Sequence, residues 1–478
     1  MKKIIFLNPT LSLTDLYNEL GESGSELPPL GISILAAITR EKGYETKIFD
    51  SLALKLNKEQ TVKRILDDSP DYLGITSTTM AIFNAAGIAS EVKRQNKDIK
   101  VIVGGPHITA APFETMELFD SFDVGVFGEA ELTIVNLLSS LDKGKKLGNV
   151  KGLVLKKGKK VFMTGKMPYV KNLDDIPMPA WDLLPDLVKY YQPAADSLYR
   201  SPATLLITSR GCPGQCIFCE KSVFGNVCRS YSAPYVIKMI KHLISNYGIK
   251  DLFIEDDNFL VFRNRLKEMC KIIIDEKIDI TWSCMGRVDM VDEEVLKLAK
   301  SAGCWQVNYG CESGSQKILD ILNKKVTVEQ IEKAVRITRN AGIGVKGLFM
   351  LGNFGESEET INETLKFVKK VPFTDFHITY FTPFPGTKAW ELASQYGNFN
   401  PDWKKINMFN ADNFVPNGLT KEQLDAYYRR IWRSFYFRPR IMWYYTKKLK
   451  NPAIRKKIIK SGMAFTKFLM KNDRKHKK

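Results

Sequence analysis

The chain has 478 residues, of which 44% are hydrophobic and 26% charged, and its formal net charge is +18. This length predicts about two to four domains, each with its own core, and the composition excludes a disordered or disulfide-stapled chain. No apolar run approaches the ~20 residues of a membrane span, and the first apolar stretch ends at Asn8 and Pro9, which favours a strand over a signal peptide. We therefore expect a cytoplasmic protein.

Residues 1–145 alternate short apolar runs with amphipathic helical patterns. The runs predict strands at 3–7, 45–50, 72–77, 100–104 and 123–127. Helical patterns fall between them, for example at 30–42 and 81–95. Strands separated by helices indicate right-handed crossovers and a parallel sheet covered on both faces. We predict a doubly wound α/β domain over residues 1–145.

Sheets of this kind bind ligands beyond the carboxyl ends of their strands, so the loops at those ends are candidate sites. Three of these loops carry glycine or hydroxyl residues: Ser77-Thr78-Thr79, Gly104-Gly105-Pro106-His107 and Gly128-Glu129-Ala130-Glu131. Glycine lets a backbone approach a ligand closely, and hydroxyl groups bind phosphate or amide groups. Ordinary turn chemistry would account for the same residues, so the loops alone do not identify a ligand.

Residues 146–200 are predicted to form a linker, with a hairpin at 150–162 and an extended proline-rich stretch at 176–181. Strands and helices alternate again over 201–400. Strands are expected near 204–209, 251–255, 281–283, 305–309, 344–350 and 375–380, and helices between them, for example at 233–247, 293–301, 328–340 and 358–371. These units predict a partial or complete β/α barrel with its active site at the C-terminal ends of the strands.

Three of the eight cysteines follow the first barrel strand. Cys212, Cys216 and Cys219 have C-x3-C-x2-C spacing in a glycine-containing loop, which is compact enough for three thiolates to reach one cluster. Three ligands would leave one iron of a cubane open. The alternatives are a structural zinc site, which normally takes four ligands, and an electron-transfer cluster with Cys228 as its fourth ligand.

This spacing at this position resembles the radical S-adenosylmethionine (SAM) superfamily. The resemblance implies a 4Fe-4S cluster on Cys212, Cys216 and Cys219 that cleaves SAM to a 5′-deoxyadenosyl radical. Segments 254–259, 310–315 and 349–356 also resemble family motifs, with Phe354 where proline is usual. The residues that the resemblance implies for SAM binding are Phe218, Glu255, Asp256, Asp257, Ser283, Arg287 and Glu312.

One branch of the superfamily carries a cobalamin-binding domain before its barrel, and segments 28–31, 104–107, 128–131 and 176–185 resemble that branch. The loop from Asn8 to Leu30 contains no histidine, so we expect none from it on cobalt. His107 is expected either to line the nucleotide pocket or to be structural. The residues that the resemblance implies for cobalamin binding are Ser77, Thr78, Thr79, Gly104, Gly105, His107, Gly128 and Glu129.

The resemblance implies a B12-dependent radical SAM enzyme that uses a reductant such as flavodoxin or ferredoxin. We expect C-methylation of an unactivated carbon in a hydrophobic or lipid-like substrate. One alternative is radical ring formation or rearrangement on a lipid or porphyrin-type substrate. Another is a vestigial N-terminal domain that binds no cobalamin.

Residues 401–478 are expected to form a helical region that ends in a basic tail. From residue 438 onward, 15 Lys and Arg residues face one acidic residue, Asp473, so the tail holds +14 of the net +18. Interleaved aromatic and aliphatic residues are typical of an amphipathic helix on anionic lipid or RNA. A solvated basic helix is the alternative. We expect peripheral contact with the inner membrane face, and nucleic acid is disfavoured because the rest of the chain carries only +4.

Overall fold

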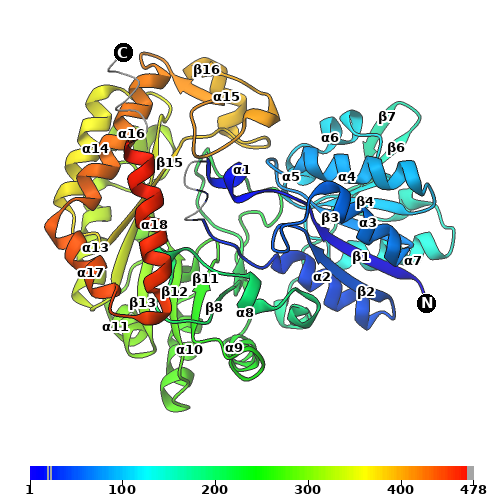
Figure 1. Ribbon diagram of the computed structural model, residues 1–478, viewed down its shortest axis with the longest axis horizontal. Helices are drawn as coiled ribbons and strands as arrows, with labels where there is room; N and C mark the ends of the chain where they lie inside the picture. The colour runs from blue at the N-terminus through cyan, green and yellow to red at the C-terminus, as the bar shows by residue number, and fades with distance from the viewer. Residues whose placement is uncertain (19–20, 22–23, 471–478) are drawn as a thin grey trace.

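The computed structural model describes residues 1–18, 21 and 24–470. Figure 1 shows two α/β halves side by side, one built from the N-terminal third of the chain and the other from the remainder. Each half has its own sheet, one with seven strands and one with six. Among the described residues, none of the helices combines the length and the apolar character needed to cross a bilayer.

The N-terminal sheet has the strand order β2-β1-β3-β4-β5-β6-β7. Its parallel part consists of β1 (Lys3–Asn8), β2 (Glu45–Asp50), β3 (Tyr72–Thr76), β4 (Lys100–Gly104) and β5 (Val124–Val126). The central strands are buried almost throughout because helices cover both faces. One face packs against α2 (Leu30–Glu41) and α7 (Glu131–Asp142), and the other packs against α3 (Lys58–Asp68) and α4 (Ile82–Gln95). The predicted doubly wound α/β fold is confirmed.

The hairpin predicted at 150–162 forms as β6 (Leu153–Lys157) and β7 (Lys160–Met163), which are antiparallel. It does not stand in a linker, because β6 pairs with β5 and extends the N-terminal sheet. Buried Leu153 and Val154 belong to the cores on the two faces of that sheet. We therefore propose that the first domain runs to about Met163 rather than to residue 145.

Shorter helices occupy the connections. Helices α1 (Leu13–Tyr17), α5 (Pro106–Ala110) and α6 (Pro112–Leu118) follow β1 and β4, and α8 (Leu187–Tyr190) precedes the second sheet. After the first barrel strand, β9 (Ser209–Arg210) and β10 (Arg229–Ser230) form a short antiparallel ribbon that encloses the cysteine loop.

The second sheet is an open, parallel half-barrel in the order β15-β14-β13-β12-β11-β8. Its strands are β8 (Ala203–Leu206), β11 (Asp251–Ile254), β12 (Thr281–Gly286), β13 (Cys304–Glu312), β14 (Gly344–Leu351) and β15 (Asp375–Tyr380). Strands β8 and β15 are edges, so the barrel is partial. The helices of this half are α9 (Ala233–Tyr247), α10 (Arg263–Asp275), α11 (Glu293–Ser301), α12 (Gln316–Ile321), α13 (Val328–Asn340) and α14 (Glu358–Lys370).

Several of these helices begin where the sequence supplies a capping side chain. Ser232, Asp292 and Thr327 each accept a hydrogen bond from a backbone N–H in the first turn of α9, α11 and α13, respectively. Helix α9 ends at Gly248, whose left-handed backbone (φ 62°) a glycine adopts without strain. These local signals explain why the predicted helices 233–247, 293–301 and 328–340 match the observed ones.

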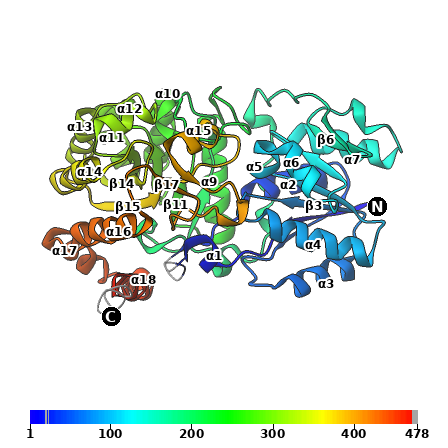
Figure 2. The same ribbon diagram turned by 90° about the horizontal axis from the view of Figure 1, so that it is seen from above.

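The chain ends with α15 (Lys388–Tyr396), the pair β16 (Gly397–Phe399) and β17 (Phe414–Pro416), and helices α16 (Lys421–Tyr436), α17 (Pro439–Lys448) and α18 (Pro452–Met470). Figures 1 and 2 both place α17 and α18 on the barrel, away from the N-terminal half. The predicted amphipathic helix is present, but Ile441, Ile458 and Phe468 are buried. These apolar residues pack on the barrel and are not available to a membrane or RNA. Residues 471–478, which were also expected in the tail, lie outside the described residues.

Candidate functional site

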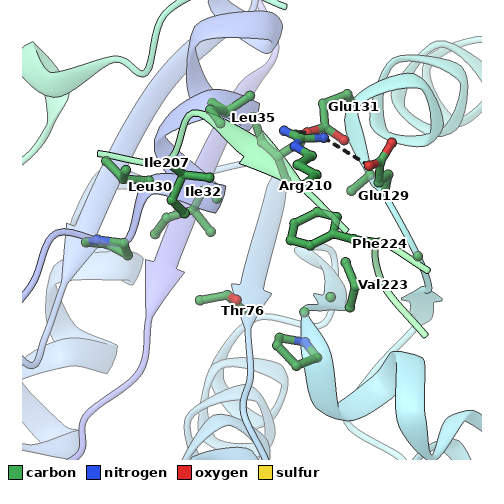
Figure 3. A pocket seen from close by; sticks show the side chains of 18 of the residues that line it. Leu30, Ile32, Leu35, Thr76, Glu129, Glu131, Ile207, Arg210, Val223 and Phe224 are labelled. Carbon is green, nitrogen blue, oxygen red and sulfur yellow. Dashed lines mark hydrogen bonds and ion pairs between the residues drawn. The ribbon is translucent and has the colours of Figure 1, made fainter. Parts of the chain in front are cut away.

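A cavity of about 730 Å³ lies between the two halves, a volume typical of small-molecule sites, which span roughly 300–1,000 Å³. The N-terminal half lines it with residues at the carboxyl ends of its strands, such as Asn8, Thr76 and Gly104. The barrel lines it with the loop after β8, including Cys212 and Cys219. The carboxyl ends of strands from both sheets therefore open onto one space, part of which is drawn in Figure 3.

Part of the cavity runs along the N-terminal sheet, where Phe6, Ile34 and Ile102 give it apolar walls. Gly74, within β3, keeps this part open: a Cβ there would lie 3.0 Å from the Phe6 ring. Gly105 has a φ of 99°, and a Cβ there would lie 2.9 Å from the Ser77 backbone nitrogen. The sequence therefore places glycine where a side chain would clash or strain the wall of the cavity.

The residues expected to bind cobalamin form two layers. Thr78, Gly104, Gly105, Gly128 and Glu129 line the cavity. The other three, Ser77, Thr79 and His107, form a buried layer behind this lining, joined by hydrogen bonds.

His107 belongs to that second layer. Its backbone nitrogen donates to the Ser77 carbonyl at 3.0 Å, and its Nδ1 lies 3.1 Å from Thr79 Oγ1. Burial lowers the pKa of His107 to about 4, so the imidazole is neutral at physiological pH. Its ring meets Trp403, from the segment between β16 and β17, edge to face at 4.4 Å. His107 therefore joins the β3 and β4 loops to a segment contributed by the barrel half.

The three cysteines of the C-x3-C-x2-C loop differ in their surroundings. Cys216 is buried, and the Cys219 thiol donates a hydrogen bond to it. That bond, together with nearby Lys324 and Arg287, lowers the pKa of Cys216 to about 6, whereas the same bond raises the pKa of Cys219. Cys219 is accessible to solvent because it faces the cavity, although protein surrounds it on most sides. Within the described residues, no group of three or more His, Cys, Asp or Glu side chains is arranged to hold a single metal ion.

Arg287 and Lys324 place positive charge beside this loop. Arg287 Nη1 lies 3.7 Å from Cys216 Sγ and donates to it, and Nη2 donates to the Lys324 carbonyl at 3.0 Å. Lys324 pairs with Glu312 at 2.7 Å, and the two side chains are at most 10% exposed. Glu312 has a φ of 62°, an unusual backbone for a non-glycine residue and one that often marks a functional site. Arg287 and Glu312, expected from the sequence, are thus brought together with Cys216.

The three acidic residues after β11 do not share one role. Asp256 is buried and accepts hydrogen bonds from Thr208 and Ser209, so it braces the chain that leads into the cysteine loop. Asp257 accepts from the Gly211 backbone nitrogen at 2.8 Å and lines the cavity. Glu255 is accessible to solvent, yet it sits deep enough between the halves that burial raises its pKa to about 7. Of the three carboxylates, only Asp256 is buried with both oxygens accepting hydrogen bonds from the protein.

The remaining expected residues lie around the same loop and in the barrel wall. Ser283 is buried in β12, and its Oγ finds no hydrogen-bond partner among the described residues. The Phe218 ring lies 6.0 Å from Lys324 Nζ. Cys228 donates from its thiol to the Gly211 carbonyl at 3.4 Å, so it supports the loop backbone. A buried hydroxyl without a partner is a typical position for a bound polar ligand or water.

Sequence reasoning missed Arg210, Arg229 and Lys324. All three are buried and paired with carboxylates. Arginine and lysine are usually exposed, and no local pattern distinguishes these from the many surface cations of the chain. Arg210 directly precedes the cysteine loop, which is the only signal that sequence alone offers.

A cavity with a three-cysteine loop on one wall and a glycine-lined α/β sheet on the other suits an enzyme that binds two cofactors. The family model of the radical SAM superfamily matches residues 206–368, and the B12 binding domain model matches residues 20–138. An uncharacterized methyltransferase of Pyrococcus horikoshii is 36% identical over 444 residues, covering 92% of this chain and 94% of the relative. The chain belongs to the radical SAM superfamily and carries a B12-binding domain.

Two further comparisons agree with this assignment. An anaerobic magnesium-protoporphyrin IX monomethyl ester cyclase of Rubrivivax gelatinosus is 27% identical over 451 residues, covering 92% of this chain and 79% of the relative. The solved structure of the cobalamin-dependent S-adenosylmethionine radical enzyme OxsB, with aqua-cobalamin and S-adenosylmethionine bound, superposes with a TM-score of 0.74. That alignment covers 98% of this chain and 72% of OxsB at 17% identity, so it supports the fold alone.

The family uses a 4Fe-4S cluster, SAM and cobalamin, so the predicted family and cofactors are confirmed. The residues present fit these groups. The pKa of Cys216 is lowered, and the Ser283 hydroxyl has no hydrogen-bond partner among the described residues. Gly74 and Gly105 keep an apolar space open along the sheet.

Proposed function

We propose that this protein is a cobalamin-dependent radical SAM methyltransferase that alkylates an unactivated carbon of a hydrophobic substrate. The observation that carries the proposal is the single cavity that brings the cysteine loop and the B12-binding half face to face. When bound, the cluster with SAM supplies the radical and cobalamin supplies the methyl group, while the protein supplies binding, orientation and exclusion of water.

Cys212, Cys216 and Cys219 are proposed to hold the cluster. Thiolates are the form that ligates iron, and Cys219, Lys324 and Arg287 lower the pKa of Cys216 by stabilising its anion. Gly214 leaves room for this arrangement, since a Cβ there would lie 2.8 Å from Arg287 Nη1. The loop is also tied to the barrel, because Ile217 N donates to the Leu322 carbonyl and Asn323 Nδ2 to the Gln215 carbonyl.

SAM is proposed to bind across the carboxyl ends of the barrel strands. Glu312, which is paired with Lys324, and the accessible carboxylates of Glu255 and Asp257 suit its cationic groups, and Arg287 suits its carboxylate. Ser283 and Phe218 add a hydroxyl group and an aromatic ring. Asp256 is proposed to act indirectly: it accepts hydrogen bonds from Thr208 and Ser209 and so fixes the start of the loop.

Cobalamin is proposed to lie against Thr78, Gly104, Gly105 and Gly128, with Ser77, Thr79 and His107 supporting those loops from behind. Glu129 is proposed to shape this wall rather than to bind cobalamin directly, because Arg229 holds its carboxylate at 2.5 Å. No histidine lies between Asn8 and Leu30, so that loop supplies no imidazole to cobalt.

The substrate is proposed to be hydrophobic because the walls near the cysteine loop are apolar. Figure 3 shows these side chains directed into the cavity from both halves: Leu30, Ile32, Leu35, Ile207, Val223 and Phe224. Such walls exclude water from the reacting carbon and favour an apolar ligand. Radical ring formation on a lipid or porphyrin-type substrate is the second candidate, favoured by the 27% identity to the cyclase.

Two partners belong to the proposal. The electron is proposed to come from a flavodoxin or ferredoxin, since radical SAM enzymes need a reductant. Peripheral contact with the cytoplasmic membrane face is proposed for the side of the tail that stays exposed, where Met442, Trp443 and Met463 accompany lysines. Cosedimentation with anionic liposomes tests the contact: Trp443→Ser with Met463→Ser should pellet less than the unmodified protein, and equal pelleting would contradict it.

The reaction is tested with SAM that carries a deuterated methyl group, in the reduced holoenzyme with a hydrophobic cell extract. Methyl transfer predicts a product that gains the labelled methyl, together with both 5′-deoxyadenosine and S-adenosylhomocysteine. A product without the label, formed with 5′-deoxyadenosine but without S-adenosylhomocysteine, would indicate ring formation instead of methylation. Failure of the wild-type protein to bind corrin would favour the vestigial alternative and overturn the proposal.

A further inference from the structure

Four buried charged side chains join the two halves beside the cavity. Arg210 and Arg229 face each other across the β9–β10 ribbon. Glu129 and Glu131 come from the loop between β5 and α7 in the N-terminal half. All four side chains are at most 10% exposed. Two like charges placed opposite each other in a buried ribbon require counter-charges, and the other half of the molecule provides both of them.

The four side chains are joined by hydrogen bonds and one longer ion pair. Arg210 Nη2 donates to Glu131 Oε1 at 2.6 Å, whereas Arg210 Nη1 lies 3.3 Å from Glu129 Oε1 as an ion pair without a hydrogen bond. Arg229 donates to both oxygens of Glu129, at 2.5 and 2.9 Å. Figure 3 shows the Arg210 guanidinium between the two carboxylates. The planar guanidinium of Arg210 thus spans two acids, which a lysine ammonium cannot match in geometry.

The network sits directly beside the cysteine loop. Arg210 is separated from Cys212 by Gly211 alone, whose φ is 85° and whose Cβ, if present, would lie 2.5 Å from the Val227 carbonyl oxygen. The Arg210 guanidinium also lies 5.2 Å from the centre of the Phe224 ring, and both residues line the cavity. A shift of Arg210 would therefore move the first cysteine of the loop and the aromatic wall together.

Stability is a weak explanation for this arrangement. A buried ion network often stabilises a fold no more than apolar residues of the same size would, because desolvation offsets the attraction. What such a network fixes is geometry, since each charge has one low-energy position. Here the fixed geometry is that of the cysteine loop relative to the wall that carries Gly128 and Glu129.

We propose that Arg210 is a positioning residue that sets the cysteine loop in register with the corrin-facing wall, with Glu131 as its anchor in the N-terminal half. The inference rests on the proposed function, because the register matters only if the cluster and the corrin share the cavity. Arg229 and Glu129 complete the clamp and keep the charge balanced.

The test compares holoenzymes of full length. Arg210→Lys keeps the charge but loses the two-acid geometry, and Glu131→Gln removes the anchor while Arg210 keeps Glu129. Arg40→Gln is the control, because Arg40 and Asp182 also form an arginine–carboxylate pair, but on the surface and away from the cavity. Iron and corrin contents are measured first, followed by the magnetic interaction between the Co(II) corrin and the reduced cluster by electron paramagnetic resonance.

We expect Arg210→Lys and Glu131→Gln to bind iron as the wild type does, and to show a shifted or broadened cobalt–cluster interaction or a loss of bound corrin. Arg40→Gln should match the wild type. If a single variant does not fold, Arg210→Gln with Glu131→Gln removes both charges together and should give the same shift. An unchanged interaction in the variants would overturn the inference alone, whereas absence of corrin from the wild type would overturn the proposed function as well.

Discussion

The two ends of the barrel use buried charge in different ways. Where the strands begin, Lys346 pairs with Asp196, and Asp375 accepts hydrogen bonds from Tyr436 and Tyr445 at 2.7 and 3.0 Å. The C-terminal helices supply these tyrosines and also Lys448, whose ammonium lies about 5 Å from the Trp305 and Tyr444 ring centres. This end is sealed by the chain itself.

Where the strands finish, polar groups are left without partners. Ser283 Oγ and Asn258 Nδ2 are buried and make no hydrogen bond within the described part of the chain. Burial raises the pKa of the Glu255 carboxyl. At the other end Lys448 Nζ also makes no hydrogen bond within the described residues, but aromatic rings and the carboxylates of Asp196 and Asp375 lie around it. The two ends therefore differ in what covers them: the C-terminal helices close one, and the other faces the cavity.

The largest effect on activity is expected at the end where the barrel strands finish. Cys216→Ala should prevent cluster assembly and reduce 5′-deoxyadenosine formation to background, because the proposed cluster would lose one of its three ligands. Iron content and product chromatography measure this. Cys270→Ala is the control, since Cys270 lies on the buried face of α10, in the hydrophobic core. Activity that survives in Cys216→Ala would contradict the assignment of this loop.

The sealed end should respond in stability rather than in chemistry. Lys346→Met removes the cation nearest to Asp196, and removing one partner of a largely buried pair lowers the free energy of unfolding by about 3 kcal/mol. Denaturant titration measures the change. Lys370→Met, which breaks an exposed pair with Glu332, should cost about 0–1 kcal/mol. Equal losses in the two variants would mean that the sealed end contributes no more than surface pairs do.

A smaller effect is expected in the B12-binding half. Gly74→Ala would crowd Phe6 in the apolar part of the cavity that runs along the N-terminal sheet. If the Phe6 ring is displaced into the space proposed for the corrin, we expect corrin binding to weaken roughly tenfold, which is about 1.4 kcal/mol. Titration of the protein with cobalamin, followed by absorbance, gives the affinity. Gly148→Ala, at a position with open space around the added methyl group, should bind like the wild type. Unchanged affinity in Gly74→Ala would place the corrin elsewhere.

The smallest effect is a pH dependence. Burial raises the pKa of Glu255 to about 7, so its carboxyl is mostly protonated at pH 6 and mostly ionised at pH 8. If the anion contacts SAM, SAM binding should tighten by up to roughly tenfold between these values. The Glu255→Gln variant should lose this dependence. Calorimetry at the two pH values measures it, and an identical pH profile in the variant would exclude Glu255 from the contact.

The sequence predicted what local patterns encode. Apolar runs located the strands of both sheets within a few residues, and capping residues such as Ser232 and Thr327 explain why the helices match. Cysteine spacing located the loop that lines the cavity. These features depend on neighbouring residues along the chain, so they can be read without knowledge of tertiary contacts.

Features that depend on distant contacts were not predictable. Nothing in segment 153–163 indicates that it joins the N-terminal sheet, and the burial of Ile441 and Phe468 depends on a barrel surface elsewhere in the chain. The same holds for Arg210 and Glu131, which meet across 79 positions of sequence. A buried arginine looks like a surface arginine until its partner is placed.

One cavity between the two halves is proposed to hold both the cluster and the corrin. The most direct measurement is anaerobic reconstitution of the full chain with iron, sulfide, cobalamin and SAM, beside a variant with Ala at Cys212, Cys216 and Cys219. We predict stoichiometric corrin in both proteins, and 5′-deoxyadenosine from the reduced wild type alone. A wild-type protein that carries iron and binds SAM, yet yields no 5′-deoxyadenosine or no bound corrin, would contradict the account.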